Sequence, residues 1–471
     1  MNNKNNKQGI SLISLIALVV SSSIGAGIFA ISNDLSAAAP GPVLLAWLFV
    51  GIGILMLAIS MSNLVLAKPK LTGLPDYARD GFGDFFGFIS GWGYWLSAWL
   101  GNVGFAVVLM QTLGYFFPVL KSGNSNGAIA LASVISWALI FLVSRGIESA
   151  TTINTIATFA KIIPLVVFII FGIVMFKIDI FTSGFWNNLN NNFTWTGSDG
   201  VIEQMRSALM VLMWVFVGIE GATIMAGRAK KKSDAARATT IGLLILLVIY
   251  VLASILPYGY FTQEQLANAN QPAMVYLFSQ MVGDWGGILI SLGMILSIMA
   301  AWLSWTLLPV ETTSQMADLK LLPAWFGKLN SRKIPINALI FTQILVQAML
   351  IATARSDNAY QFVYSLAVAA TMITYSFVAA YQLKLGWQEK NNRFIIVGLL
   401  ALLFQLFVIY LAGLQFVWLT AIAYIPGFVL LGIAYFKNNR KFTTFEIIMM
   451  SLISILAISA IVALATKTLT I

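Results

Sequence analysis

Long apolar stretches with few charges alternate with short polar connections along the whole chain of 471 residues. A hydrocarbon core about 30 Å thick is crossed by roughly 20 consecutive apolar residues in a helix, whereas barrel strands alternate over about ten residues. The stretches are too long and too continuous for barrel strands. The pattern therefore predicts an all-α polytopic membrane protein with thirteen transmembrane helices, over residues 10–38, 41–67, 82–117, 126–144, 149–175, 201–227, 236–260, 284–313, 335–353, 359–384, 394–413, 415–436 and 444–466.

The composition agrees with this pattern and removes several kinds of chemistry. Hydrophobic residues make up 59% of the chain and charged residues 9%, whereas a soluble domain carries about 25% charged residues. The chain has no histidine and no cysteine, which removes most zinc, haem and iron–sulfur sites and the usual thiol or histidine-base chemistry. We therefore expect no metal, no cofactor and no enzymatic activity.

Basic residues mark one side of the predicted bundle. Placing Lys4 and Lys7 in the cytoplasm puts most lysines and arginines into cytoplasmic connections, as the positive-inside rule requires. The basic run Lys230–Lys232 then indicates topology rather than a nucleic-acid contact, so no nucleic-acid partner is expected. The odd number of spans predicts a cytoplasmic N-terminus and an extracellular C-terminus, with the lipid bilayer around the bundle.

Two predicted spans are interrupted near their middle. The first contains Ser21–Phe29, with three serines and two glycines, and the sixth contains Trp214–Ala222, with two glycines around Glu220. Glycine and serine weaken a helix, and either cluster alone is explained by close helix packing. Together they occupy the first span of two successive five-span blocks that run in opposite directions. That arrangement marks a secondary-transporter site near the bilayer midplane.

The two breaks also suggest how the chain is divided and what it binds. A tail at 1–9 precedes a first repeat at 10–175 and a second, inverted repeat at 201–384, followed by two spans at 394–436 and an additional C-terminal span at 444–466. Unwinding frees backbone N–H groups that suit a carboxylate and carbonyl groups that suit an ammonium. One broken helix can thus bind both charged groups of an amino acid.

A few polar and aromatic side chains lie deep in the predicted spans. Glu220 and Lys161 are functional candidates because burial of an ionisable group in a membrane is costly. Glu220 is a candidate cation contact, proton carrier or coupling element, with a structural hydrogen-bonded carboxylate as the alternative. Lys161 is expected near the unwound part of the first span, with snorkelling as the alternative. Trp214 and Trp305 could stack on a cationic side chain or simply pack in the core, and Asn102 could bond across helices or to a ligand.

Four motifs together resemble the amino acid–polyamine–organocation superfamily, in particular its bacterial basic amino acid/polyamine antiporters, the arginine/ornithine and arginine/agmatine exchangers. The motifs are Ser22–Phe29, Gly91–Asn102, Trp214–Gly221 and Leu303–Leu308. The resemblance covers residues 10–436. It implies a LeuT-like core of five-plus-five inverted repeats with additional helices, and alternating access in a bacterial cytoplasmic membrane.

The resemblance also implies a substrate site. Backbone groups of Gly25–Gly27 would bind the substrate carboxylate, Asn102 would contact the distal cationic group, and Trp214 would close over the substrate. The implied site comprises Ser22, Ser23, Ile24, Gly25, Ala26, Gly27, Ala98, Asn102, Trp214, Val217 and Trp305.

Gating and coupling roles follow from the same resemblance. Trp305 matches a gate at mid-depth, and Tyr375 matches a residue that closes the inner path. Glu220 matches a carboxylate that helps couple the transport cycle, and Lys161 matches a lysine found in many members of the superfamily. These four residues, together with Trp214, are the predicted moving or coupling elements.

The departures from the family concern the side-chain pocket. Ser22 stands where the arginine/agmatine exchangers carry asparagine, and Ala98 and Ala367 replace small polar residues. The leading prediction is exchange of a cationic amino acid for its metabolic product, of the arginine/ornithine type, with histidine/histamine, lysine/cadaverine and ornithine/putrescine left open. Proton-coupled or facilitative uptake without obligatory exchange is the alternative. The sequence leaves open whether the protein is a monomer or a homodimer.

Overall fold

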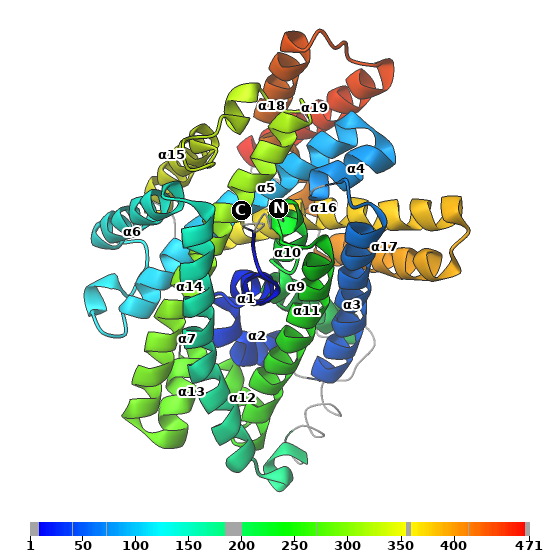
Figure 1. Ribbon diagram of the computed structural model, residues 1–471. Coiled ribbons are helices and arrows are strands. Elements are labelled where there is room, and N and C mark those ends of the chain that lie inside the picture. Colours follow the sequence, from blue (N-terminus) through cyan, green and yellow to red (C-terminus); the bar gives the residue numbers. More distant parts are fainter. Residues whose placement is uncertain are drawn as a thin grey trace, which may run out of the picture.

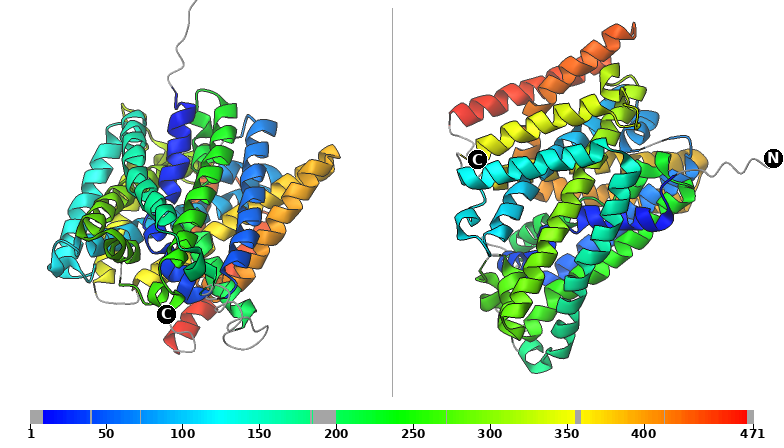
Figure 2. Two further views of the ribbon diagram at one scale, coloured as in Figure 1. Left: turned by 90° about the horizontal axis from the view of Figure 1, so that it is seen from below. Right: turned by 60° about the vertical axis from the view of Figure 1, so that its left-hand side comes forward.

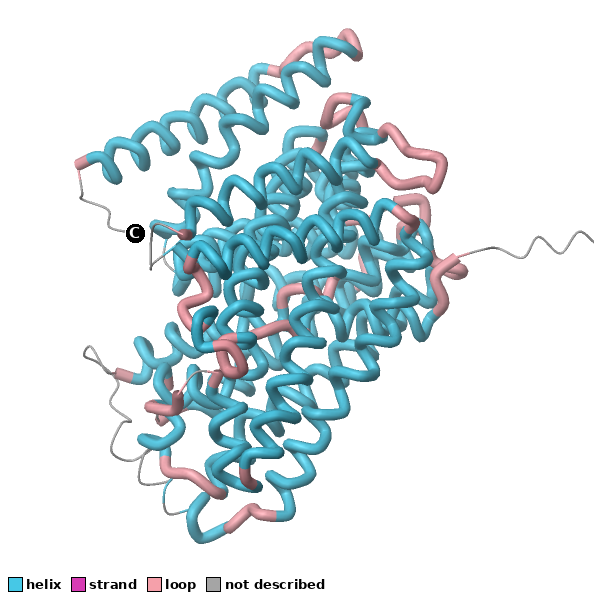
Figure 3. Tube along the Cα trace, turned by 90° about the vertical axis from the view of Figure 1, so that its left-hand side faces the viewer, coloured by secondary structure: helices cyan, strands magenta, loops and turns pink. Residues whose placement is uncertain are grey.

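The computed structural model describes residues 9–466 except 40, 72, 183, 185–199, 271, 355–358 and 413. Within these residues the chain is helical, without a strand, and loop segments lie at the ends of the long helices and also inside the bundle (Figure 3). Residues 1–8 of the predicted tail lie outside the described residues. The all-α polytopic architecture that the hydropathy pattern predicts is confirmed.

Eleven helices in the described part of the chain are long and apolar enough to cross a membrane. They are α3 (Val43–Ala67), α5 (Asp84–Leu113), α6 (Asn126–Ser144), α7 (Ile147–Val174), α11 (Lys232–Ile255), α14 (Asp284–Asp318), α15 (Ile336–Thr353), α16 (Ala359–Glu389), α17 (Asn392–Ala412), α18 (Leu414–Lys437) and α19 (Thr444–Ala465). Large apolar side chains such as Leu452 and Ile455 of α19 are exposed. That exposure is expected of a helix surrounded by lipid.

The first and sixth predicted spans are each divided in two. α1 (Leu12–Ser23) and α2 (Ile31–Ala38) flank a short 3-10 turn, η1 (Gly27–Phe29). α9 (Val201–Phe216) and α10 (Gly221–Ile224) form one crossing that is bent by 41° and continues as η3 (Met225–Arg228). Both helices break at the glycine clusters identified in the sequence. With α1 and α2 counted as one crossing, the helices follow the predicted stretches in order.

The broken helices lie in the middle of the bundle. Figure 1 shows α1, α2, α9 and α10 between α7 and α14 on one side and α3 and α11 on the other. α1 packs against α7, α10, α11 and α14, and α9 packs against α3. α18 and α19 form a hairpin at the outer edge, and α1 begins and α19 ends at opposite ends of the bundle (Figure 2). A chain that crosses the membrane an odd number of times has its two ends on opposite sides.

Short elements connect the long helices, and local capping explains where several helices begin. The short elements are α4 (Leu74–Phe82), η2 (Pro118–Leu120), η4 (Leu256–Gly259), α12 (Gln263–Ala267), α13 (Ala273–Val282) and η5 (Ala324–Gly327). The Ser11 side chain accepts from the Ser14 N–H at 3.2 Å and starts α1. Thr443 and Glu446 form a reciprocal capping box that starts α19. Such caps replace the hydrogen bonds that the first turn of a helix lacks.

Candidate functional site

The break between α1 and α2 leaves backbone carbonyl groups that side chains of other helices satisfy. Lys161 of α7 is fully buried, and its Nζ donates to the carbonyl oxygens of Ser21 at 3.0 Å and Ile24 at 2.6 Å. Ser297 of α14 also donates to the Ile24 carbonyl, at 3.0 Å. The structure therefore places the Lys161 ammonium against the unwound segment of the first span.

Two backbone donors in the same break lack a hydrogen-bond partner within the part of the chain that the structure describes. Among the described residues, no acceptor takes the N–H groups of Ala26 or Gly27. Ser23 Oγ is buried and likewise lacks a partner within the described part of the chain. Ser23, Ala26 and Gly27 all line one cavity. Free N–H and hydroxyl groups at the start of a helical segment suit an anionic ligand group.

The second break brings backbone directly against backbone. Gly218 has a φ of 116°, and a Cβ added to it would lie 2.7 Å from the backbone carbon of Ser22. Ser22 Oγ donates to the Gly218 carbonyl at 2.7 Å. The Gly218 N–H donates to Glu220 Oε2 at 3.0 Å, and the Tyr375 hydroxyl donates to the same oxygen. The fully buried Glu220 carboxylate thus fixes the break and joins it to α16.

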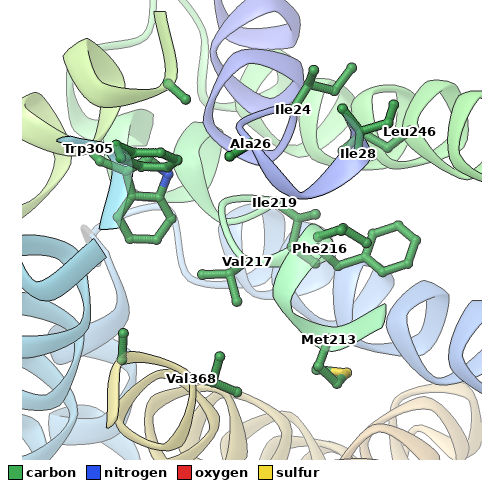
Figure 4. Packing of buried hydrophobic residues seen from close by; sticks show 14 of the residues in the cluster. Ile24, Ala26, Ile28, Met213, Phe216, Val217, Ile219, Leu246, Trp305 and Val368 are labelled. Atoms are coloured by element: carbon green, nitrogen blue, oxygen red, sulfur yellow. The ribbon is translucent and has the colours of Figure 1, made fainter. Parts of the chain in front are cut away.

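A cavity with an empty volume of about 360 Å³ lies between the two breaks. Residues of α1, the two breaks, α5, α9 and α14 line it: Ser22, Ser23, Gly25, Ala26, Gly27, Ser97, Gly101, Phe105, Trp214, Val215, Val217 and Trp305. Figure 4 shows Ala26, Val217 and Trp305, which come from three different elements, around this region. The space inside it that is free for the centre of a water-sized sphere is only about 20 Å³, so the cavity is nearly closed in this structure.

Most of the predicted substrate site is gathered at this cavity, but three residues are not. Eight predicted residues line it, and Ile24, Ala98 and Asn102 do not. The Ile24 carbonyl faces Lys161, and Ala98 is buried within the bundle. Asn102 donates from Nδ2 to the backbone carbonyl of Trp305 at 3.2 Å. Asn102 therefore joins α5 to α14 through Nδ2, while its Oδ1 is buried without a hydrogen-bond partner among the described residues.

Residues that the sequence did not single out form the α5 wall of the cavity. Ser97, Gly101 and Phe105 line it, and the first two directly precede Ala98 and Asn102 in the sequence. Residues four apart lie on one helix face, and each step of one residue turns that face by about 100°. The available signal was the pair of small residues Ser97 and Gly101 at a spacing of four, since small residues allow close approach.

Two of the three predicted gating residues, Trp214 and Trp305, line the cavity, whereas Tyr375 does not. Trp305 Nε1 donates to the Ser22 carbonyl at 2.8 Å, and the Trp305 ring stacks on Tyr94 with centroids 6.1 Å apart. Trp214 lies against Gly27, because a Cβ added there would be 3.0 Å from Trp214 Cδ1. The two indoles therefore each contact the unwound part of the first span.

The end of the bundle at which α1 begins is held together by polar contacts. Arg228 of η3 pairs with Glu311 of α14, with Nε and Oε2 2.8 Å apart. The Ile10 N–H donates to the Arg228 carbonyl at 3.0 Å. Gln315 of α14 donates to the Ile224 carbonyl at 3.1 Å. These contacts join the first broken helix, the second broken helix and α14 at one end.

The described residues contain no cluster of possible metal ligands. Within the described residues, no group of three or more aspartates, glutamates, histidines or cysteines could hold a metal ion. The buried charged groups at the breaks instead bond to backbone and to tyrosine, as described for Lys161 and Glu220.

Gly218→Ala is expected to lower the temperature of thermal unfolding clearly. The added Cβ would clash with the Ser22 backbone, and the φ of 116° would be strained for alanine, at a cost on the order of 1–3 kcal/mol. Unfolding in detergent, followed by tryptophan fluorescence, measures the change. Gly51→Ala is the control, because its added Cβ would meet only Leu247 at 3.7 Å. Equal unfolding temperatures for the two variants would contradict the close backbone approach.

Comparison with known proteins gives consistent matches over the whole bundle. The family model described as amino acid permease matches residues 10–431. An arginine/ornithine antiporter of Latilactobacillus sakei is 55% identical over 435 residues, which cover 91% of this chain and 91% of that protein. An arginine/ornithine antiporter of Lactococcus lactis subsp. cremoris is 48% identical, over 98% of this chain and 96% of its own. An arginine/agmatine antiporter of Chlamydia caviae is 35% identical, over 99% of both chains.

Proposed function

Because this chain belongs to the amino acid permease family, we propose that it exchanges a cationic amino acid for its metabolic product across the bacterial cytoplasmic membrane, with arginine and ornithine as the first pair. The observation that carries the proposal is the cavity between the two breaks, where free backbone donors and two indole rings surround one space. Relatives that span nearly the whole chain are named as antiporters of arginine with ornithine or agmatine.

The substrate's charged groups are matched by groups around the cavity. The free N–H groups of Ala26 and Gly27 and the Ser23 hydroxyl would bind the carboxylate. Carbonyl groups at the end of α9, around Val217, would accept from the α-ammonium, because the last carbonyls of a helix lack partners within it. The cationic side chain would stack on Trp214 or Trp305 with about 1–2 kcal/mol when desolvated.

The chain would be organised as two inverted repeats around this cavity. The first would comprise 10–175 and the second 201–384, each opening with a broken helix, with 394–436 and 444–466 added. The predicted orientation places the end at which α1 begins in the cytoplasm and the end of α19 outside. The positions of α1 and α19 at opposite ends of the bundle fit two termini on opposite sides of the membrane. The exposed apolar residues of α19 fit contact with lipid.

Alternating access would work by breaking and re-forming contacts around the cavity. Trp214 and Trp305 would close over the substrate, and Tyr375 with Glu220 would close the path toward the cytoplasm. Glu220 and Lys161 would act as coupling elements, because each fixes one of the two unwound segments through buried hydrogen bonds. The Arg228–Glu311 pair would have to separate for the cytoplasmic end to open.

Uptake of a cationic amino acid without obligatory exchange, facilitative or coupled to protons, is the second candidate. The observation that favours it is the presence of two fully buried ionisable residues, Glu220 and Lys161, at the breaks. Ionisable groups inside a membrane commonly carry protons in transporters. The two candidates differ in whether efflux requires a substrate on the opposite side.

Competition against labelled arginine tests the substrate class. Vesicles that contain the purified protein and are loaded with ornithine are expected to take up labelled arginine, and external ornithine should inhibit this uptake strongly. Leucine should inhibit at least roughly tenfold less well, because it lacks the cation that stacks on an indole. Protein-free vesicles serve as the control. Equal inhibition by leucine and ornithine would contradict a site for cationic amino acids.

A further inference from the structure

One face of α5 forms a wall that runs along the cavity. Ser97, Gly101 and Phe105 lie on this face at a spacing of four residues. Phe105 lies near the first break, since a Cβ added to Gly25 would come within 2.7 Å of its ring. Ser97 lies two turns away, about 12 Å along the helix. A substrate held at its carboxylate by the first break would therefore extend its side chain along this wall toward Ser97.

The Ser97 hydroxyl is oriented by a second hydroxyl on α16. Thr371 Oγ1 donates to the Ala367 carbonyl at 3.0 Å, which uses its one hydrogen. Ser97 Oγ and Thr371 Oγ1 are hydrogen-bonded to each other, and either oxygen can be the donor by geometry. When the Thr371 hydrogen lies on the Ala367 carbonyl, Ser97 donates in this bond. The Ser97 oxygen then offers only lone pairs to the cavity. Both side chains are buried, which keeps water from competing for this bond.

From these contacts, and on the premise of the proposed exchange, we propose that Ser97, held as a hydrogen-bond acceptor by Thr371, selects a cationic side-chain terminus over a neutral one of the same shape. A guanidinium or ammonium presents only N–H donors and fits a lone pair. A terminal carbonyl oxygen would face the Ser97 oxygen, and the lone pairs of the two acceptors would repel each other. Ser97 is thus a specificity-determining residue, and Thr371 is the residue that positions it.

Gly101 provides the room that a broad terminus needs on the same wall. A Cβ added to Gly101 would meet no heavy atom within 4 Å, so the space beside it is open. A planar guanidinium is broader than an ammonium. Gly101→Ala is therefore expected to weaken competition by arginine more than competition by ornithine, whereas equal weakening would contradict a spatial role for this position.

The test of the proposal is competition by arginine and by citrulline. Citrulline has a side chain of the same length and shape, but it ends in a neutral urea with a carbonyl oxygen. Vesicles with the wild-type protein should bind arginine at much lower concentrations than citrulline, measured as inhibition of labelled ornithine uptake. Ser97→Ala is expected to reduce the ratio of the two inhibitory concentrations about tenfold, the loss of one hydrogen bond to a charged group. The maximal rate should change much less than the ratio.

Variants of Thr371 separate the orientation of Ser97 from the shape of the site. Thr371→Val keeps the volume but frees the Ser97 hydrogen, and should lower the ratio by a similar factor. Thr371→Ser keeps the hydroxyl and should preserve the ratio. The double variant Ser97→Ala with Thr371→Val should lower the ratio no further than either single change, because both changes act on the same oriented Ser97 acceptor. Thr374→Val is the matched control, since that hydroxyl donates to the Ser90 carbonyl at 2.8 Å and lies outside the cavity lining.

The outcomes distinguish this assignment from the proposed function. Arginine–ornithine exchange with an unchanged ratio in Ser97→Ala and Thr371→Val overturns the role of Ser97 and leaves the proposed exchange intact. A wild-type protein that does not distinguish arginine from citrulline overturns both. If Ser97→Ala fails to fold, as judged by its thermal unfolding, the comparison of Thr371→Val with Thr371→Ser decides, and equal ratios in those two variants overturn the assignment.

Discussion

Lys161→Met is expected to reduce arginine–ornithine exchange at least roughly 100-fold and to lower the temperature of thermal unfolding. The Lys161 ammonium donates to the carbonyls of Ser21 at 3.0 Å and Ile24 at 2.6 Å. Methionine has a similar length but no donor. The Ser21 carbonyl would lose this partner, at a cost of about 1–3 kcal/mol, and the Ile24 carbonyl would keep only Ser297; a 100-fold loss corresponds to about 2.8 kcal/mol. The unwound segment that presents donors to the substrate would therefore lose its conformation.

The rate of labelled arginine uptake into ornithine-loaded vesicles measures this effect. Lys177→Met is the matched control, because Lys177 follows α7 and is exposed. It removes the same charge without leaving a buried carbonyl unpaired, so its exchange rate should stay near that of the wild type. Wild-type exchange by Lys161→Met would mean that the ammonium is not needed to hold the break.

Glu220→Ala is expected to abolish exchange as well. Glu220 Oε2 accepts from the Gly218 N–H at 3.0 Å and from the Tyr375 hydroxyl, and alanine would leave both donors buried and unpaired, at about 1–3 kcal/mol each. It would also disconnect the second break from α16. The effect should exceed that of Tyr375→Phe, which removes one of the two bonds, and it should appear in the maximal exchange rate.

Glu203→Ala provides the control for this substitution. Glu203 lies in the first turn of α9, and its side chain is 46% exposed. Removing an exposed carboxylate on the same helix should change exchange little, because surface ion pairs contribute about 0–1 kcal/mol. Glu220→Ala with wild-type exchange, at a normal protein level, would show that the carboxylate has no part in the transport cycle.

The position of the two breaks could be predicted from the sequence because their residues are unfavourable in an ordinary membrane span. Glycines and serines in Ser21–Phe29, and the carboxylate of Glu220 between two glycines, weaken a helix in the middle of lipid. Such residues persist where the backbone must unwind. The contact between Ser22 and the Gly218 backbone could not be predicted, because it depends on how two distant helices meet.

The face of α5 that lines the cavity also could not be predicted. The motif Gly91–Asn102 contains small, aromatic and polar residues on every side of the helix, so hydrophobic periodicity does not identify the inward face. The structure turns Ser97 and Gly101 to the cavity and lets Asn102 bond to the Trp305 carbonyl. A difference of one residue turns a helix by about 100°, which only the packing of α5 against α14 and α16 determines.

Efflux from preloaded vesicles tests the central claim most directly, that the cavity between the two breaks serves obligatory exchange. Vesicles with the purified protein are loaded with labelled arginine and diluted into buffer with or without ornithine. We expect external ornithine to accelerate efflux at least roughly 100-fold over buffer alone, an effect that Lys161→Met should remove. Efflux at the full rate into buffer without substrate would contradict obligatory exchange.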